Sequence, residues 1–175
     1  MSAGNVIFKN LIREVPDFPQ KGISFKDITT LLHDGPGLKA ALMGMLEPFG
    51  KEPIDYVIGV ESRGFIFGTP MAVELGCGFV PVRKPGKLPC ETLQQDYALE
   101  YGSDSLEIHK DAIQPGQSVL MVDDLLATGG TMEAACQLVE SLHGRIVGIS
   151  FLVELSFLKG RQRLAGYRLE SLIQY

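Results

Sequence analysis

The sequence has only three cysteines, Cys77, Cys90 and Cys136, and no long apolar run. An odd number of cysteines without metal-ligand spacing argues against a disulfide framework or a zinc site, so we expect free thiols in a reducing compartment. No apolar stretch approaches the ~18 residues that a membrane-spanning helix needs, and no charged and then apolar leader opens the chain. We therefore expect a cytoplasmic protein without a membrane partner.

Positive charge is also scarce, because 16 Lys and Arg stand against 21 Asp and Glu, for a net charge of -5. Nucleic-acid backbones are bound by basic surfaces, so this balance argues against a nucleic-acid partner. The 175 residues, 45% of them hydrophobic, are enough for one domain with a full core. An anionic ligand would need local basic groups and a divalent cation.

The most informative segment is residues 119–131, where a buried strand pattern runs into a small, polar turn. The apolar residues 119–122 are followed by Asp123 and Asp124 and then by a Thr-Gly-Gly-Thr turn, before an amphipathic helix pattern starts. Glycines let the backbone approach a ligand closely, and a helix start attracts anions. This pattern predicts a phosphate site, with Thr131 as the helix cap.

The two adjacent carboxylates indicate which kind of molecule carries the phosphate. Carboxylates at the end of a buried strand repel each other and lose water, so they need a polar or cationic partner, such as the hydroxyls of a ribose or a metal ion. A phosphate site beside a diol site indicates a ribose 5-phosphate. An ordinary strand, turn and capped helix is the alternative. A P-loop does not fit, since no Lys occurs between Asp111 and Glu154.

Strand and helix patterns alternate along the chain, which predicts an α/β fold with a mainly parallel central sheet flanked by helices. Residues 84–105 break this alternation with a polar segment too long for an ordinary connection, so we expect a flexible functional loop there. We expect an extended segment at residues 22–28, strands at residues 54–60, 79–82, 106–109, 118–123, 145–153 and 167–173, and helices at residues 6–15, from 36, 64–75, 131–143 and 157–164.

Three loops follow predicted strands and can converge at the carboxyl edge of the sheet: residues 61–64, 83–87 and 123–131. Arg63, in the first loop, can fork onto a diphosphate or simply pair with Glu61. The second loop concentrates three cations, which are either solvated or paired with a diphosphate: Arg83, Lys84 and Lys87.

Residues 122–131 resemble the phosphoribosyl-diphosphate motif of the type I phosphoribosyltransferase family. Further segments resemble the adenine-specific branch of that family, in the same order: residues 16–19, 61–65, 83–89, 99–102 and 158–161. The resemblance implies one domain over residues 1–175, with an N-terminal helix and base-binding hood at about 1–34 and a lid at about 84–105. It also implies a homodimer, Mg2+ as cofactor, and conversion of adenine and 5-phosphoribosyl 1-diphosphate to AMP and diphosphate.

The resemblance also assigns roles to single residues. Glu100 matches the catalytic glutamate, while Phe25 would stack on the base opposite Leu125 or Leu126, with the Ser24 backbone at its edge. From the residues alone, ordinary core is the favoured interpretation of Phe25, and a solvated loop residue that of Glu100. Mg2+ would be held mainly by substrate and water, without a direct protein ligand. The predicted substrate-binding residues are Ser24, Phe25, Arg63, Arg83, Lys84, Lys87, Tyr101, Asp123, Asp124, Leu125, Leu126, Ala127, Thr128, Gly129, Gly130 and Thr131.

Three alternatives share the phosphate motif: a 6-oxopurine phosphoribosyltransferase, a non-catalytic regulator that senses phosphoribosyl diphosphate, and a catalytically inactive scaffold. The first would need a Lys reaching the oxo group, and residues 148–154 offer none. The second usually carries a DNA-binding module, for which the chain has no room. Ser24 and Lys26 depart from the apolar residue and the Arg expected there, which bears on the contacts to the base.

Overall fold

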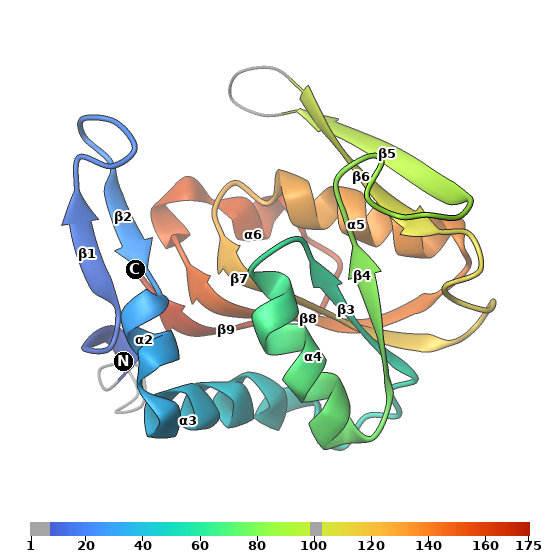
Figure 1. The fold of residues 1–175 in the computed structure, drawn as a ribbon, viewed down its shortest axis with the longest axis horizontal. Helices are drawn as coiled ribbons and strands as arrows, with labels where there is room; N and C mark the ends of the chain where they lie inside the picture. Colours follow the sequence, from blue (N-terminus) through green and yellow to red (C-terminus); the bar gives the residue numbers. More distant parts are fainter. Residues whose placement is uncertain (1–7, 99–102) are drawn as a thin grey trace. The chain divides into compact units, whose positions relative to one another are not determined.

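A computed structural model describes residues 8–98 and 103–175 of the chain. These residues form two compact units, Met1–Gly44 and Met45–Tyr175 (Figure 1). The described part of the predicted hood segment, residues 8–34, lies within the first unit.

The first unit is built around a short antiparallel pair of strands, β1 (Arg13–Pro16) and β2 (Ser24–Asp27). Helix α2 (Thr29–His33) follows, and α3 (Gly35–Leu46) begins in the same unit, as the Pro36 signal predicted. The predicted helix over residues 6–15 is wrong beyond Lys9, because only residues 8 and 9 of its described part are helical. The residues before Pro16 are extended instead and pair with β2, in keeping with the bias that a proline imposes on the residue before it.

The second unit contains a five-stranded sheet whose neighbouring strands are all parallel, in the order β4-β3-β7-β8-β9. This confirms the predicted parallel sheet, with the C-terminal strand at its edge. The central strand, β7, is almost wholly buried, as its apolar run predicted. The strands are β3 (Tyr56–Val60), β4 (Gly78–Val82), β7 (Ser118–Leu126), β8 (Arg145–Glu154) and β9 (Leu169–Gln174).

Helices α4 (Gly64–Leu75) and α5 (Gly130–Ser141) flank this sheet (Figure 1). Helix α4 packs on β3 and β7, while α5 packs on β7 and β8. The apolar face predicted for α5 is buried, with Met132, Ala135, Cys136 and Val139 at 1% exposure or less. Short helical segments complete the unit: η1 (Glu47–Phe49), η2 (Ser156–Leu158) and α6 (Gly160–Arg163).

A separate antiparallel hairpin occupies much of the segment predicted as an irregular loop. Its strands are β5 (Thr92–Ala98) and β6 (Ser103–His109), so part of the predicted loop at residues 84–105 is strand, whereas residues 84–91 lie in no helix or strand. The strand predicted at residues 106–109 is confirmed as the end of β6, which pairs with β5 in a separate two-stranded sheet. Leu106 and Ile108 are fully buried in the core and the hairpin packs on α5, which explains why polar residues alternate with apolar ones.

Within residues 8–98 and 103–175, no helix has both the length and the apolar character needed to cross a bilayer.

Candidate active site

The predicted phosphate motif forms the junction between the central strand and the helix that follows it. Strand β7 continues past Asp123 to Leu126, and α5 begins at Gly130. Gly129 is the N-cap of α5 and has a φ of +86°, a conformation that side chains disfavour. The prediction that Thr131 caps the helix is therefore wrong, because Thr131 already lies inside its first turn.

This junction lines a cavity of about 350 Å³. The cavity brings together the carboxylate pair, the turn at residues 127–131 and the loop that carries Arg63. All three predicted loops therefore contribute to the lining of the cavity, and the second contributes only Lys84. The lining residues are Glu61, Ser62, Arg63, Lys84, Tyr97, Asp123, Asp124, Leu125, Leu126, Ala127, Thr128, Gly129, Gly130, Thr131, Met132 and Phe151.

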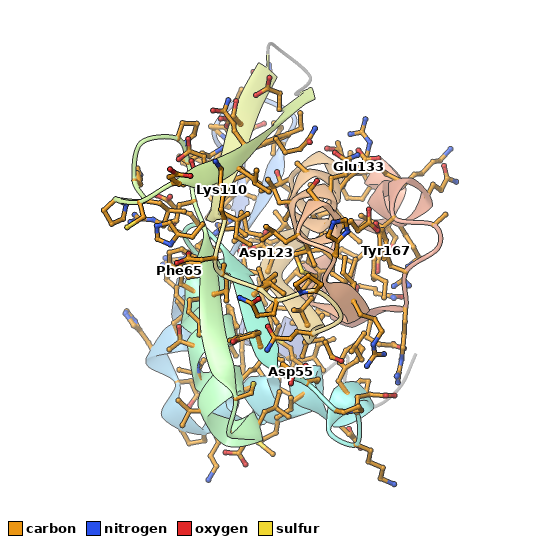
Figure 2. All side chains as sticks on the ribbon, turned by 90° about the vertical axis from the view of Figure 1, so that its right-hand side faces the viewer. Asp55, Phe65, Lys110, Asp123, Glu133 and Tyr167 are labelled. Carbon is orange, nitrogen blue, oxygen red and sulfur yellow. The ribbon has the colours of Figure 1, made fainter. Side chains whose placement is uncertain are left out.

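The carboxylate pair is electrostatically strained, as the sequence indicated. Burial, reinforced by the neighbouring charge of Asp124, raises the pKa of Asp123 well above its ordinary value. Burial also raises the pKa of Asp124, although Arg63 offsets part of this effect. Asp123 is labelled near the centre of the view in Figure 2. A ligand that donates hydrogen bonds to these carboxylates would relieve the strain.

Arg63 holds one of the two carboxylates directly. Its Nε lies 2.9 Å from Oδ2 of Asp124, whose side chain is only 7% exposed. The backbone N–H of Asp124 donates to Oδ1 of Asp123 at 2.9 Å. The predicted alternative partner, Glu61, instead pairs with Arg83 and Lys87. Arg63 therefore reaches the carboxylate side of the cavity.

The basic loop at residues 83–87 is tied down by acidic groups. Glu61 accepts hydrogen bonds from the backbone N–H of Lys84 at 3.0 Å and from Nε of Arg83 at 3.3 Å, and it also pairs with Lys87. Burial opposes ionisation of Glu61, but these donors outweigh it and lower its pKa. The cations are therefore paired rather than simply solvated.

Lys84 has its own set of partners on the β5–β6 hairpin. Its Nζ donates to the hydroxyl of Tyr97 at 2.8 Å and pairs with Asp104. Burial opposes the charged form, but these two groups outweigh it and raise the pKa of Lys84. Of the three cations of the basic loop, Lys84 is the one among the cavity-lining residues. The hairpin thus holds a cation at the cavity.

The residues predicted to bind the base belong to two strands, β7 for Leu125 and Leu126 and β2 for Ser24 and Phe25. Leu126 is 1% exposed and belongs to the core, whereas the partly exposed Leu125 can offer its side chain to a base. Ser24 and Phe25 lie on β2 in the first unit, where the Phe25 ring packs edge-on against Phe18 with 5.1 Å between centroids. Glu100 and Tyr101 lie outside the described residues, so their roles stay predictions.

Five cavity-lining residues were not predicted as binding residues: Glu61, Ser62, Tyr97, Met132 and Phe151. Phe151 lies opposite Asp123 in the parallel register of β7 and β8. Its place at the cavity could have been inferred from the rule that ligands bind near the carboxyl ends of neighbouring parallel strands. Tyr97 had no such signal, because its place depends on the hairpin.

Residues 30–167 match the model of the phosphoribosyl transferase domain. Adenine phosphoribosyltransferase of Clostridium perfringens is 58% identical to the chain over 167 residues, which cover 95% of this chain and 97% of that protein. The chain belongs to the adenine phosphoribosyltransferase family.

Solved structures of this family share the fold. The crystal structure of the enzyme from Rhodothermus marinus matches with a TM-score of 0.93 and 51% identity, and the match covers 98% of both chains. The enzyme from Saccharomyces cerevisiae, solved with adenine and an imino-altritol bisphosphate, matches with a TM-score of 0.91 and 40% identity over 98% of this chain and 99% of that one. The adenine phosphoribosyltransferase family thus shares both the sheet and the N-terminal unit.

Proposed function

We propose that the chain transfers the phosphoribosyl group of 5-phosphoribosyl 1-diphosphate to adenine, giving AMP and diphosphate for purine salvage. The main structural support is the cavity that joins Asp123 and Asp124 to the turn at residues 127–131. That combination suits a ribose 5-phosphate, while Arg63 and Lys84 at the same cavity suit a diphosphate. The relatives' preference for adenine favours it over a 6-oxopurine.

The chemistry follows from where charge develops. As the bond from C1 of the ribose to the diphosphate loosens, positive charge grows on the sugar and negative charge on the leaving group. Arg63 and Lys84 stabilise the diphosphate, with Arg83 and Lys87 nearby in the same loop. Asp123 and Asp124 hold the ribose hydroxyls and the turn fixes the phosphate, so the base nitrogen attacks a carbon that is held in place.

The donor set at the cavity fits a magnesium ion carried mainly by the substrate. Oxygen ligands are what this metal prefers, and it usually keeps several waters and substrate phosphates. Among residues 8–98 and 103–175, no cluster of three or more His, Cys, Asp or Glu side chains could hold a metal ion alone. When bound, the ion would neutralise charge on the leaving group, while Asp123 and Asp124 would hold the ribose hydroxyls.

The base is recognised by the hood and the lid. Phe25 and Leu125 offer apolar surfaces for the two faces of adenine, and backbone groups of Ser24 read its edge. Glu100 manages a proton on the base or stabilises developing positive charge, and Tyr101 contacts the substrate from the same lid. Closure of the lid keeps water, a competing nucleophile, away from the cationic sugar.

The protein is proposed to act as a homodimer in the cytoplasm. Helix α4 presents Ile66 and Val73, which are 39% and 77% exposed, and such apolar side chains suit a contact between subunits. Sedimentation equilibrium tests the assembly: we expect twice the mass of one chain, and a monomer at micromolar concentration would contradict it.

The function is tested by offering the purified protein labelled adenine, hypoxanthine and guanine in turn, each with 5-phosphoribosyl 1-diphosphate and Mg2+. We expect AMP to form rapidly, with little product from the other two bases. Preferential formation of IMP or GMP would favour the 6-oxopurine alternative. Binding of the diphosphate substrate without any product would favour the sensing regulator. A second series without Mg2+ should show strongly reduced turnover.

Thr131→Val should weaken AMP binding about tenfold, since it removes one hydrogen bond to a charged phosphate. Valine has nearly the same shape, so the fold should be retained. Thr92→Val on β5, outside the cavity, is the matched control and should bind AMP like the wild type. Isothermal titration calorimetry measures both affinities, and unchanged AMP binding by Thr131→Val would argue against this phosphate site.

A further inference from the structure

The segment that starts at the last residue of β8, residues 154–163, packs against the phosphate-binding turn. It contains the sequence Leu158-Lys-Gly-Arg161, to which the proposed chemistry assigns no role. Its closest approach is at Gly160, where an added β-carbon would overlap the carbonyl oxygen of Ala127. A β-carbon added to Gly129 would likewise lie 2.8 Å from the carbonyl oxygen of Gly160. The two glycines thus allow two backbone segments to touch where side chains would separate them.

Further contacts tie the same segment to both ends of the turn. Before the turn, the backbone N–H of Leu155 donates to the carbonyl oxygen of Leu126 at 2.9 Å. After the turn, Arg163 on α6 forms an ion pair of 3.1 Å with Glu133 in the first turn of α5. The segment therefore contacts the strand before the turn, the turn itself and the helix after it.

An ion pair between the half-exposed Arg161 and the buried carboxylate of Glu154 anchors this segment. Arg161 donates to both carboxylate oxygens of Glu154, from Nη2 at 2.7 Å and from Nε at 3.2 Å, and its Nη1 donates to the carbonyl oxygen of Leu169. Glu154 is 5% exposed. Burial opposes its ionisation, but the bonds from Arg161 outweigh this and lower its pKa. Such a forked, bidentate pair holds α6 to β8 and β9 with defined geometry.

We propose that residues 154–163 are a positioning element that holds the phosphate-binding turn in its binding conformation, with Gly160 as the contact point and the Arg161–Glu154 pair as its anchor. The inference rests on the proposed function, since the ligand of the turn is the 5-phosphate. Several backbone amides bind one phosphate only when their N–H groups are all directed at it. A displacement of about 1 Å at a reacting site can lower the rate on the order of a hundredfold. A rigid support behind the turn prevents that displacement.

Gly160→Ala tests the contact, because its added methyl must push Ala127 away. We expect the Kd for AMP and the KM for 5-phosphoribosyl 1-diphosphate to rise about tenfold or more, while kcat at saturating substrate falls less than about threefold. Gly50→Ala is the matched control, since a β-carbon there would meet nothing closer than 3.8 Å, and it should match the wild type.

A merely structural role gives a different pattern. If Gly160 served only the fold, the variant would lose active protein, so kcat would fall while KM and the Kd for AMP stayed at wild-type values. That result, or wild-type values throughout, would overturn the inference. Arg161→Gln provides the same test without a steric clash and should raise both constants about threefold, so it decides the matter if Gly160→Ala does not fold. Failure of the proposed function is distinguishable, because the wild type itself would then not bind AMP.

Discussion

Glu100→Gln is expected to lower kcat by about two to three orders of magnitude while the KM for 5-phosphoribosyl 1-diphosphate stays within about twofold. The amide keeps the shape of the carboxylate but can neither accept a proton from the base nor carry negative charge beside a cationic sugar. The diphosphate and the phosphate are bound elsewhere, so affinity for this substrate should persist. Steady-state kinetics with each substrate varied in turn measures both constants.

The control for this variant lies in the same part of the chain. Glu91 precedes β5 and pairs with Lys110 at 3.0 Å, with its side chain 84% exposed. Glu91→Gln should therefore turn over like the wild type. If Glu100→Gln also kept full turnover, the assignment of Glu100 would be wrong. A large rise in KM with unchanged kcat would instead make it a binding residue.

Asp123→Asn should stabilise the fold at pH 8 and at the same time lower kcat/KM by about a hundredfold. Asparagine can still accept the hydrogen bond from the backbone N–H of Asp124, so the local geometry should survive. It lacks the charge that burial and Asp124 oppose, so we expect a higher free energy of unfolding than that of the wild type. It also loses an anionic acceptor for the ribose hydroxyls, which accounts for the loss of activity.

The pH dependence of this stability gain has a definite sign. A carboxyl whose pKa is raised in the folded protein binds its proton more tightly there than in the unfolded chain. The stabilisation that the protonated Asp123 carboxyl gives the folded protein is fully present below the pKa of the unfolded chain, near 3.8. It is lost as the pH rises through the pKa of Asp123 in the folded protein. The advantage of Asp123→Asn should therefore be largest at alkaline pH and should shrink toward pH 4.

Urea unfolding of the ligand-free protein at several pH values measures this effect. Asp111→Asn, at an exposed site, is the control and should follow the wild type. An Asp123→Asn variant that is less stable than the wild type at pH 8 would show that the carboxylate is well accommodated in the fold. The strain proposed for the pair would then be wrong.

The strand, turn and helix around the phosphate site could be predicted because their signals are local. The apolar run of β7, the glycines of the turn and the apolar face of α5 each depend on residues close in sequence. The order of the parallel strands allowed the further prediction that the loops after them converge, as the cavity shows.

The features that escaped prediction depend on contacts between different segments of the chain. The polar residues 92–98 form a strand because β6 pairs with them and α5 covers their apolar side. The pairing of Arg63 with Asp124, and of Glu61 with Arg83 and Lys87, joins residues more than 20 positions apart. Residues 13–16 form a strand for the same reason, against a helical pattern. The residues within and next to a segment do not determine which partner it pairs with.

The most direct test of the central claim is a crystal structure of the protein with AMP bound. We expect the phosphate to accept hydrogen bonds from the backbone N–H groups of residues 128–131, with the ribose hydroxyls at Asp123 and Asp124. A phosphate bound instead at the cations of residues 83–87, with the ribose away from the carboxylate pair, would contradict it.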